Sequence, residues 1–175
     1  MLAGGMATRL GELAKTVPKS MQLVNGRPFI FFKLEEIRMM GIRNVIMCVG
    51  HLKKKIILGV GSEYKDIQIQ YSAERYPLGT GGAVNRSLSL INEKRVLVTN
   101  GDTLLSFIDK KFRNDFLESK NTTLLVNRNY NNTVSGVVNI GSDGRIDKIE
   151  KAVPHNSFRH LGYTILETEK LLNFH

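Results

Sequence analysis

Hydrophobic positions change their spacing several times along the chain, and each change marks a predicted element. Over residues 28–40 apolar side chains recur at helical spacing, with a proline near the start and a glycine directly after the end, which predicts a helix. The run at 44–50 is short, apolar and rich in β-branched residues, which is typical of a strand buried on both faces. A helix with a solvated, lysine-rich face is predicted over 51–61, and an alternating strand over 67–71.

The alternation of helix and strand continues as far as residue 118, with a helix over 81–91 and a buried strand over 95–102. Such alternation favours an α/β fold in which a mostly parallel central sheet carries helices on its faces. After residue 120 strands dominate, and they are predicted at 122–126, 136–140, 145–151 and 162–167, with a last helix at 168–174. The Asp-Gly pair at 143–144 predicts a hairpin.

Length and composition indicate one globular domain over residues 1–175. The chain is 42% hydrophobic and 23% charged, and none of its apolar runs approaches the roughly 20 residues that a spanning helix needs. No secretory signal is recognised, so a cytoplasmic location is expected, with no membrane partner. Cys48 is the single cysteine and lies in an apolar run, which favours a buried thiol over a nucleophile.

Positive charge is concentrated at the amino-terminal end. The net charge is +9, and residues 1–60 carry ten basic and three acidic side chains. An anionic ligand is therefore expected there, and nucleotides or phosphorylated metabolites are the first candidates. Nucleic acid is a weaker candidate and is not expected as a partner, because no aromatic side chains are interleaved with the basic residues and no nucleic-acid-binding motif is recognised.

Three loops carry residue types suited to phosphate chemistry. In the opening segment Gly4 and Gly5 leave room for backbone amides to approach phosphate oxygens, and Arg9 and Lys19 add positive charge. A glycine pair is also common at an ordinary tight turn, so both interpretations stay open. Ligands of open α/β sheets bind beyond the carboxyl ends of the strands, which is where these loops are expected.

The second loop, NGDT at 100–103, places Asp102 at the end of a predicted buried strand. A carboxylate in that position can hold Mg²⁺, although an aspartate that caps a turn is an equal alternative. The third loop, ERYPLGTGGA at 74–83, opens a predicted helix whose first amides could face an anion or a base. It too could be a simple glycine-rich turn.

Together these loops are much more specific than any one of them. LAGGMATRL at 2–10, PKSM at 18–21, PLGTGGA at 77–83 and NGDT at 100–103 resemble the sugar-phosphate nucleotidyltransferase family, whose opening pattern is L-A-G-G-x-G-T-R-L followed by P-K-x-M. The resemblance covers nearly the whole chain. The PLGTGGA segment is closest to the bacterial branch that activates mannose-type and heptose 1-phosphates.

The resemblance implies a Rossmann-like α/β/α fold of the GT-A-like kind, with a nucleotide-binding half over 1–118 and an incomplete sugar-binding half over 119–175. It implies transfer of NMP from an NTP, by preference GTP, to a sugar 1-phosphate, with release of pyrophosphate and with Mg²⁺ as cofactor. Arginine, lysine and Mg²⁺ would act by positioning and charge stabilisation, so no protein nucleophile is needed. Members of the family are often oligomers, and a homo-oligomer stays open.

The resemblance also assigns roles to particular positions. The residues expected to be catalytic are Arg9, Lys19 and Asp102, with Asp102 also the metal ligand. Those expected to bind the nucleotide are Leu2, Ala3, Gly4, Gly5, Glu74, Pro77, Gly79 and Thr80. Those expected to bind the sugar phosphate are Gly136, Glu150 and Lys151.

The chain departs from the family pattern in several places. Only Met1 stands where the family has an apolar strand before L-A-G-G, and the family's second, C-terminal metal-binding aspartate has no counterpart, so the chain is expected to be truncated at both ends. Ala7 replaces a glycine, and His160 stands where an asparagine usually contacts the sugar. These departures keep a catalytically impaired nucleotide-binding paralogue as the first rival, and the net charge keeps a nucleic-acid binder as a distant one.

Overall fold

The computed structural model describes residues 1–5, 11–105, 109–127, 137–150 and 158–172. Its amino-terminal half contains a sheet of three strands. β3 (Asn44–Val49) pairs with β5 (Ile67–Ala73) in parallel, and β4 (Glu63–Tyr64) joins β5 in the antiparallel sense. The apolar run and the alternating segment therefore form strands as predicted.

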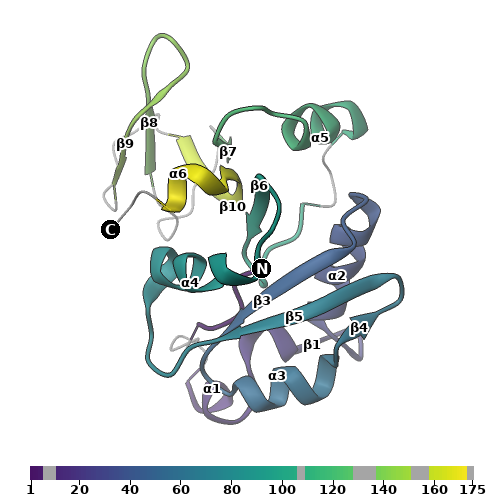
Figure 1. The fold of residues 1–175 in the computed structure, drawn as a ribbon. Helices are drawn as coiled ribbons and strands as arrows, with labels where there is room; N and C mark the ends of the chain where they lie inside the picture. The colour runs from purple at the N-terminus through teal and green to yellow at the C-terminus, as the bar shows by residue number, and fades with distance from the viewer. Residues whose placement is uncertain (6–10, 106–108, 128–136, 151–157, 173–175) are drawn as a thin grey trace.

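The first residues of the chain connect this sheet to the second one. Leu2 forms parallel bridges with Cys48 of β3 and with Asn100, the residue after β6 (Arg95–Thr99). Its amide donates to the Thr99 carbonyl at 2.8 Å, and the Ala3 amide donates to the Cys48 carbonyl at 2.8 Å. The amino terminus consequently lies in the middle of the molecule, between β3 and β6 (Figure 1).

The second sheet is antiparallel and is organised around β10 (Phe158–Glu167). This strand pairs with β6, β7 (Thr123–Asn127) and β8 (Val137–Ile140), and β8 pairs with β9 (Ile146–Glu150). The α/β class is confirmed. Among the named strands of the described chain only β3 and β5 pair in parallel, however, so the sheet system as a whole is mixed.

Helices cover both faces of the parallel strands. α2 (Phe29–Met39) and α3 (Lys53–Val60) pack on the face that carries Val45, Met47 and Val49, and their apolar side chains form the main core. α4 (Gly79–Ser87) lies against the other face, where the Cys48 thiol donates to the Ala83 carbonyl at 3.5 Å. Helix, sheet and helix thus form three layers, and Cys48 is buried as expected.

Several element boundaries differ from the sequence prediction. The helix predicted over 81–91 is α4, which begins at Gly79 and is followed by a 3₁₀ turn over Leu88–Leu90. β6 ends at Thr99 instead of continuing to 102, since the chain turns at 101–102. β10 begins at Phe158, four residues before the predicted start, and contains an irregularity between His160 and Thr164.

Short elements complete the described chain. They are α1 (Glu12–Thr16), the 3₁₀ turn Lys19–Met21, β1 (Leu23–Val24), β2 (Arg27–Pro28), α5 (Lys110–Leu117) and α6 (Thr168–Leu172). The hairpin of β1 and β2 and the strand β4 were not predicted, since two-residue strands carry no periodicity. In the described part of the chain, every helix is too short or too polar to cross a membrane.

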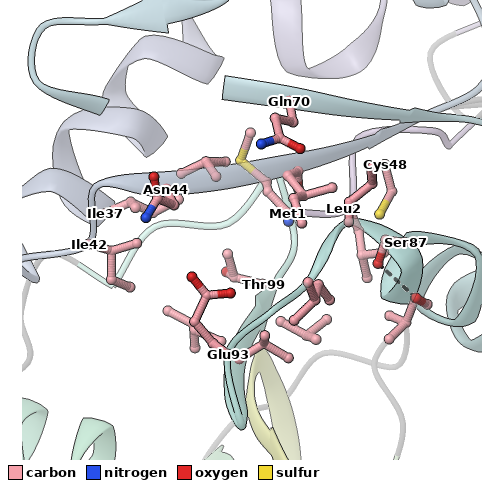
Figure 2. Close-up of a pocket in the computed structure, with 18 of the residues that line it drawn as sticks. Met1, Leu2, Ile37, Ile42, Asn44, Cys48, Gln70, Ser87, Glu93 and Thr99 are labelled. Carbon is pink, nitrogen blue, oxygen red and sulfur yellow. Dashed lines mark hydrogen bonds between the residues drawn. The ribbon is translucent and has the colours of Figure 1, made fainter. Parts of the chain in front are cut away.

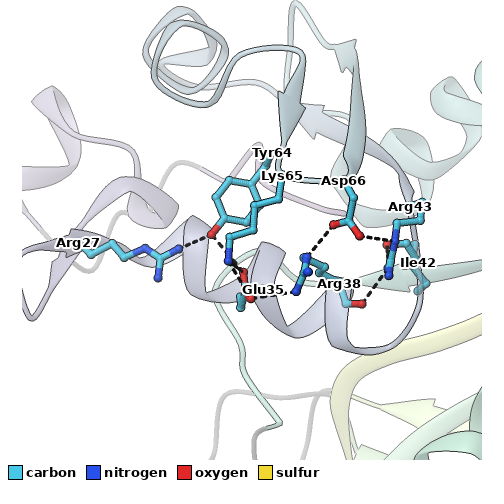
Figure 3. A network of polar contacts seen from close by, with 8 residues as sticks. All are labelled: Arg27, Glu35, Arg38, Ile42, Arg43, Tyr64, Lys65 and Asp66. Carbon is cyan, nitrogen blue, oxygen red and sulfur yellow. Dashed lines mark hydrogen bonds and ion pairs between the residues drawn. The ribbon is translucent and has the colours of Figure 1, made fainter.

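A surface network of charged side chains fastens α2 to the β4–β5 hairpin (Figure 3). Asp66 accepts from Arg38 at 2.6 Å and from Arg43 at 2.8 Å, while Glu35 accepts from Lys65 at 2.9 Å. All these side chains are at least partly exposed, and such pairs contribute little each. Within the first 60 residues, the network therefore pairs the charges of Arg38 and Arg43 with carboxylates.

Candidate nucleotide-binding site

The loops that follow three neighbouring strands come together at their carboxyl ends. The Gly101 amide donates to the Leu2 carbonyl at 2.8 Å, and the His51 amide donates to the Gly4 carbonyl at 3.3 Å. The opening segment, the loop after β3 and the NGDT loop after β6 are therefore in direct contact. This is the edge of the sheet where α/β proteins bind their ligands.

Close backbone approach in this cluster requires glycine at two positions. A Cβ on Gly50 would lie 2.5 Å from Glu74 Oε1 and 3.0 Å from the Gly4 carbonyl oxygen. A Cβ on Gly4 would lie 3.1 Å from both Glu74 Oε1 and the Gly50 amide. The Glu74 carboxylate thus lies close to both glycines, and a side chain at Gly50 would displace it. Gly50 was missed by sequence reasoning, because a glycine after a strand is a common turn residue.

Glu74 also organises the third predicted loop. Its backbone amide donates to the Val49 carbonyl at 2.9 Å, and its Oε2 accepts from the Leu78 amide at 3.2 Å, just before α4 begins. Lys53 donates to the Glu74 carbonyl at 2.8 Å, so one lysine of the predicted solvated run has a structural partner in this loop. These contacts fix Glu74 between the end of β3 and the start of α4.

The remaining predicted residues of this loop are exposed to solvent. They are Pro77, Gly79 and Thr80. Gly79 has a φ of +70°, a left-handed conformation that favours glycine, and it begins α4. The first turn of α4 therefore lies on the surface beside the Glu74 loop, with its amide groups available to a ligand.

Lys19 and Asp102 are in direct contact although 83 positions separate them. Lys19 Nζ lies 2.5 Å from Asp102 Oδ2, and the two side chains are 52% and 35% exposed. Thr103 Oγ1 donates to the other carboxylate oxygen at 3.3 Å. An exposed pair of this kind contributes at most about 1 kcal/mol, so both groups can exchange this contact for a ligand. The structure brings together two of the three residues predicted to be catalytic.

Asp102 is the described residue best placed to hold a metal ion. No group of three His, Cys, Asp or Glu side chains suited to a metal occurs within the described ranges. A single, accessible carboxylate nevertheless fits Mg²⁺, which is commonly held by one or two carboxylates together with substrate phosphates and water. Asp102 is therefore a candidate ligand for a divalent cation.

The predicted sugar-phosphate residues are tested least. Gly136 and Lys151 lie outside the described residues, as does Arg9, which was predicted to be catalytic. Glu150 is the last residue of β9, where it pairs with Val137 of β8. His160 Nε2 lies 2.9 Å from Thr164 Oγ1 inside β10, and burial lowers the pKa of this imidazole.

A cavity of about 480 Å³ lies next to the site, between β3 and β6 (Figure 2). Met1 and Leu2 form its inner end, and its walls include Ile37 and Ile42 on one side and Glu93 on the other. Met1, Asn44 and Ile46 line it together with Leu97 and Thr99. It is distinct from the exposed region around Lys19 and Asp102.

Comparisons with known proteins show which proteins the chain resembles in sequence. The chain is 41% identical over 104 residues to D-glycero-alpha-D-manno-heptose 1-phosphate guanylyltransferase of Campylobacter jejuni and 36% identical over 104 residues to the enzyme of that name from Aneurinibacillus thermoaerophilus. These alignments cover 59% of this chain but only 46% and 45% of the two relatives. The chain therefore matches about half the length of these curated relatives.

Solved structures share the fold over almost the whole chain. HddC from Yersinia pseudotuberculosis, complexed with GMP-PN, superposes with a TM-score of 0.78 at 26% identity, covering 99% of this chain and 77% of that one. A glucose-1-phosphate thymidylyltransferase structure from Bacillus anthracis gives a TM-score of 0.81 at 22% identity, covering 98% of this chain and 71% of that one, and supports the fold alone. The family model described as nucleotidyl transferase matches residues 1–155. The chain therefore belongs to the nucleotidyl transferase family.

Proposed function

We propose that this chain is the nucleotide-binding part of a sugar-1-phosphate nucleotidyltransferase. It would transfer GMP from GTP to a heptose- or mannose-type sugar 1-phosphate, releasing pyrophosphate and forming a sugar nucleotide for surface glycan synthesis. The observation that carries the proposal is the contact of Lys19 with Asp102 at 2.5 Å, beside the Gly4 and Gly5 loop. A cation and a carboxylate in this position suit a nucleotide triphosphate and its metal ion.

The preference for guanine rests on the relatives. Two of them are named as heptose 1-phosphate guanylyltransferases, and the Yersinia structure contains a guanine nucleotide analogue. A more distant relative, 26% identical over 157 residues, is named as a glucose-1-phosphate thymidylyltransferase of Streptomyces griseus. The base is therefore the part of the proposal that direct binding measurements must test first.

The described residues suggest how the reaction would proceed. The phosphate oxygen of the sugar 1-phosphate attacks the α-phosphorus of GTP, the bond from that phosphorus to the bridging oxygen breaks, and pyrophosphate leaves. Lys19 would neutralise charge on the reacting phosphates, and amides of the Gly4–Gly5 segment would orient the triphosphate. Asp102 would hold Mg²⁺, which when bound would supply positive charge to offset that of the reacting phosphates. No protein nucleophile or base is required, because the attacking oxygen already carries negative charge.

Pyrophosphate release from GTP plus heptose or mannose 1-phosphate tests the proposal. We expect Asp102→Asn to abolish metal-dependent turnover and Lys19→Ala to lower kcat by at least about 100-fold, since each removes charge stabilisation at the reacting phosphates. Lys111→Ala, on the exposed face of α5, is the matched control and should retain full activity.

Nucleotide binding separates the proposal from its rivals. Calorimetric titration with GTP, CTP, UTP and dTTP in the presence of Mg²⁺ should give the tightest binding with GTP. Binding of GTP without any turnover would instead favour a non-catalytic nucleotide-binding protein. Absence of GTP binding, together with salt-sensitive binding of an oligonucleotide, would refute the proposal in favour of a nucleic-acid binder.

A further inference from the structure

A buried polar cluster lies beneath the site and includes residues that the proposed reaction does not use. Lys33 of α2 is 0% exposed, Glu36 of α2 is 7% exposed and Tyr163 of β10 is 1% exposed. Lys33 Nζ donates to Glu36 Oε2 at 2.8 Å, and the Tyr163 hydroxyl donates to the same oxygen at 2.5 Å. Lys33 Nζ also donates to the Tyr163 hydroxyl, so the three side chains form a closed set.

The remaining hydrogen bonds of this cluster go to the loop that contains Asp102. Lys33 Nζ donates to the Thr103 carbonyl at 2.9 Å, which uses the third and last donor of the ammonium group. Glu36 Oε1 accepts from the Leu105 amide at 2.6 Å. The cluster therefore binds the backbone directly after Asp102 at two points, once through a carbonyl and once through an amide.

The other side of Asp102 is fixed by backbone contacts. The Gly101 amide donates to the Leu2 carbonyl at 2.8 Å, and the Asn100 amide donates to the Gly162 carbonyl at 3.0 Å. Asp102 thus lies between two anchored stretches of chain, one tied to the opening segment and one tied to the buried cluster. Its exposed side chain is held on a fixed backbone.

Burying this ionic cluster costs free energy that apolar side chains in the same place would not. Burial lowers the pKa of Lys33 to about 8, even though Glu36 opposes the shift, and burial raises the pKa of the Tyr163 hydroxyl. A buried ion pair is often no more stabilising than apolar side chains of the same volume, since both charges lose their hydration. Stability alone therefore gives no reason for these residue types, whereas hydrogen bonds to a defined backbone segment do.

We propose that Lys33, Glu36 and Tyr163 are positioning residues, which fix the backbone of residues 103–105 and so hold the Asp102 carboxylate opposite Lys19. The role rests on the proposed function, because a fixed carboxylate matters only if Asp102 meets a cation and phosphates. The cluster itself touches neither substrate nor metal. It also links the nucleotide-binding half, through α2, to β10 of the second sheet.

Tyr163→Phe tests this role with the least change in volume. It removes the hydroxyl that donates to Glu36 and accepts from Lys33, while leaving the ring in the core. In the metal-free protein we expect the Leu105 amide to exchange its hydrogen about 10-fold faster, because its acceptor becomes less constrained. We also expect Mn²⁺, titrated in the presence of GTP and followed by electron paramagnetic resonance, to bind about 10-fold more weakly.

Tyr71→Phe is the matched control. Tyr71 lies in β5 and its hydroxyl donates to the Gly61 carbonyl at 2.5 Å, so it has no hydrogen bond to the Asp102 loop and its loss should change neither readout. In turnover assays Tyr163→Phe should lower kcat about 10-fold and leave the KM for the sugar 1-phosphate within about 2-fold. A general loss of stability would instead speed amide exchange throughout the described core and not at Leu105 alone.

Unchanged Leu105 exchange and unchanged Mn²⁺ affinity in folded Tyr163→Phe would overturn the proposal. If that variant does not fold, Glu36→Gln serves in its place, since the amide oxygen can still accept from Leu105 but the ion pair with Lys33 is lost. Hydrogen exchange is measured without turnover, so it tests the positioning role independently of the proposed enzymatic activity. An inactive parent protein with normal Leu105 protection would count against the proposed function and not against this role.

Discussion

At the scale of single residues, the environment of the Met1 amine is unusual. The amine is buried and donates to the Ile46 carbonyl at 2.7 Å, where a backbone amide would continue the strand pairing begun by Leu2 and Ala3. Burial lowers the pKa of this amine below its ordinary 8.0, because a charged group loses its hydration. The structure therefore favours a neutral group at this position.

The lowered pKa predicts a pH effect on stability. Between the folded pKa of the amine and 8.0 the unfolded chain binds more protons than the folded one, so the free energy of unfolding should rise as pH rises through that interval. N-acetylation of Met1 removes the titrating group and keeps the N–H donor. Melting temperatures of the free and acetylated proteins from pH 5.5 to 8.5 should differ in slope, and parallel curves would contradict the assignment.

At the scale of elements, β10 connects more of the second sheet than any other described strand. It pairs with β6, β7 and β8, and it bends at an irregularity that contains Gly162. Gly162 has a φ of +78°, and a Cβ there would lie 2.6 Å from the Asn100 side-chain nitrogen. The bend in β10 is thus packed directly against the loop that leads to Asp102.

Replacing Gly162 should lower the free energy of unfolding by more than the strain of its left-handed backbone conformation alone. Gly144 has nearly the same φ, +79°, but no atom lies within 4 Å of a Cβ built there, so Gly144→Ala measures the conformational term by itself. We expect Gly144→Ala to lower the free energy of unfolding by about 1 kcal/mol and Gly162→Ala by about 2–4 kcal/mol. Equal losses in urea denaturation would show that the contact with Asn100 is unimportant.

At the scale of the whole molecule, the cavity between β3 and β6 separates the two sheets. Successive residues of a strand direct their backbone N–H and C=O groups to opposite sides. Cys48 of β3 and Thr99 of β6 bond to the opening segment. Asn44 and Leu97, an even number of residues away on the same strands, therefore direct their backbone groups into the cavity from opposite sides. An extended segment that continues the chain on the amino side of Met1 would meet both edges in the parallel direction. Such a strand would join the two sheets into one.

Appending four apolar residues before Met1 should therefore stabilise the protein. Val-Ile-Val-Ile would bury side chains worth about 1.5–3 kcal/mol each, against about 1–2 kcal/mol per residue for ordering the backbone. We expect the free energy of unfolding to rise by about 2–4 kcal/mol and the melting temperature by about 5–15 °C.

A Gly-Ser-Gly-Ser extension of the same length is the control for this prediction. It removes the charge from the Met1 amine equally but supplies no apolar side chains. Calorimetry should therefore show little gain for it compared with the apolar extension. Equal melting temperatures for the two extended proteins would rule out strand insertion.

Local sequence signals accounted for most of the regular structure and for the loops of the site. The apolar run of β3 and the helical spacing of α2 predicted both elements to within one residue at each end. The Asp-Gly turn predicted the hairpin of β8 and β9, where the Gly144 amide donates to the Gly141 carbonyl. Two-residue strands and the start of β10 were missed, because their pairing depends on distant partners.

The sequence by itself determined the alternation of elements, the α/β class and the loops in which Lys19, Glu74 and Asp102 lie, since periodicity and turn chemistry are local properties. Only the tertiary structure decided that Lys19 meets Asp102 across 83 residues. It alone decided that Gly50 leaves room for Glu74 and that Lys33 and Tyr163 meet beneath the loop. These contacts depend on how separate strands and helices pack against one another. No short segment of the sequence carries that information, because the residues in contact lie far apart along the chain.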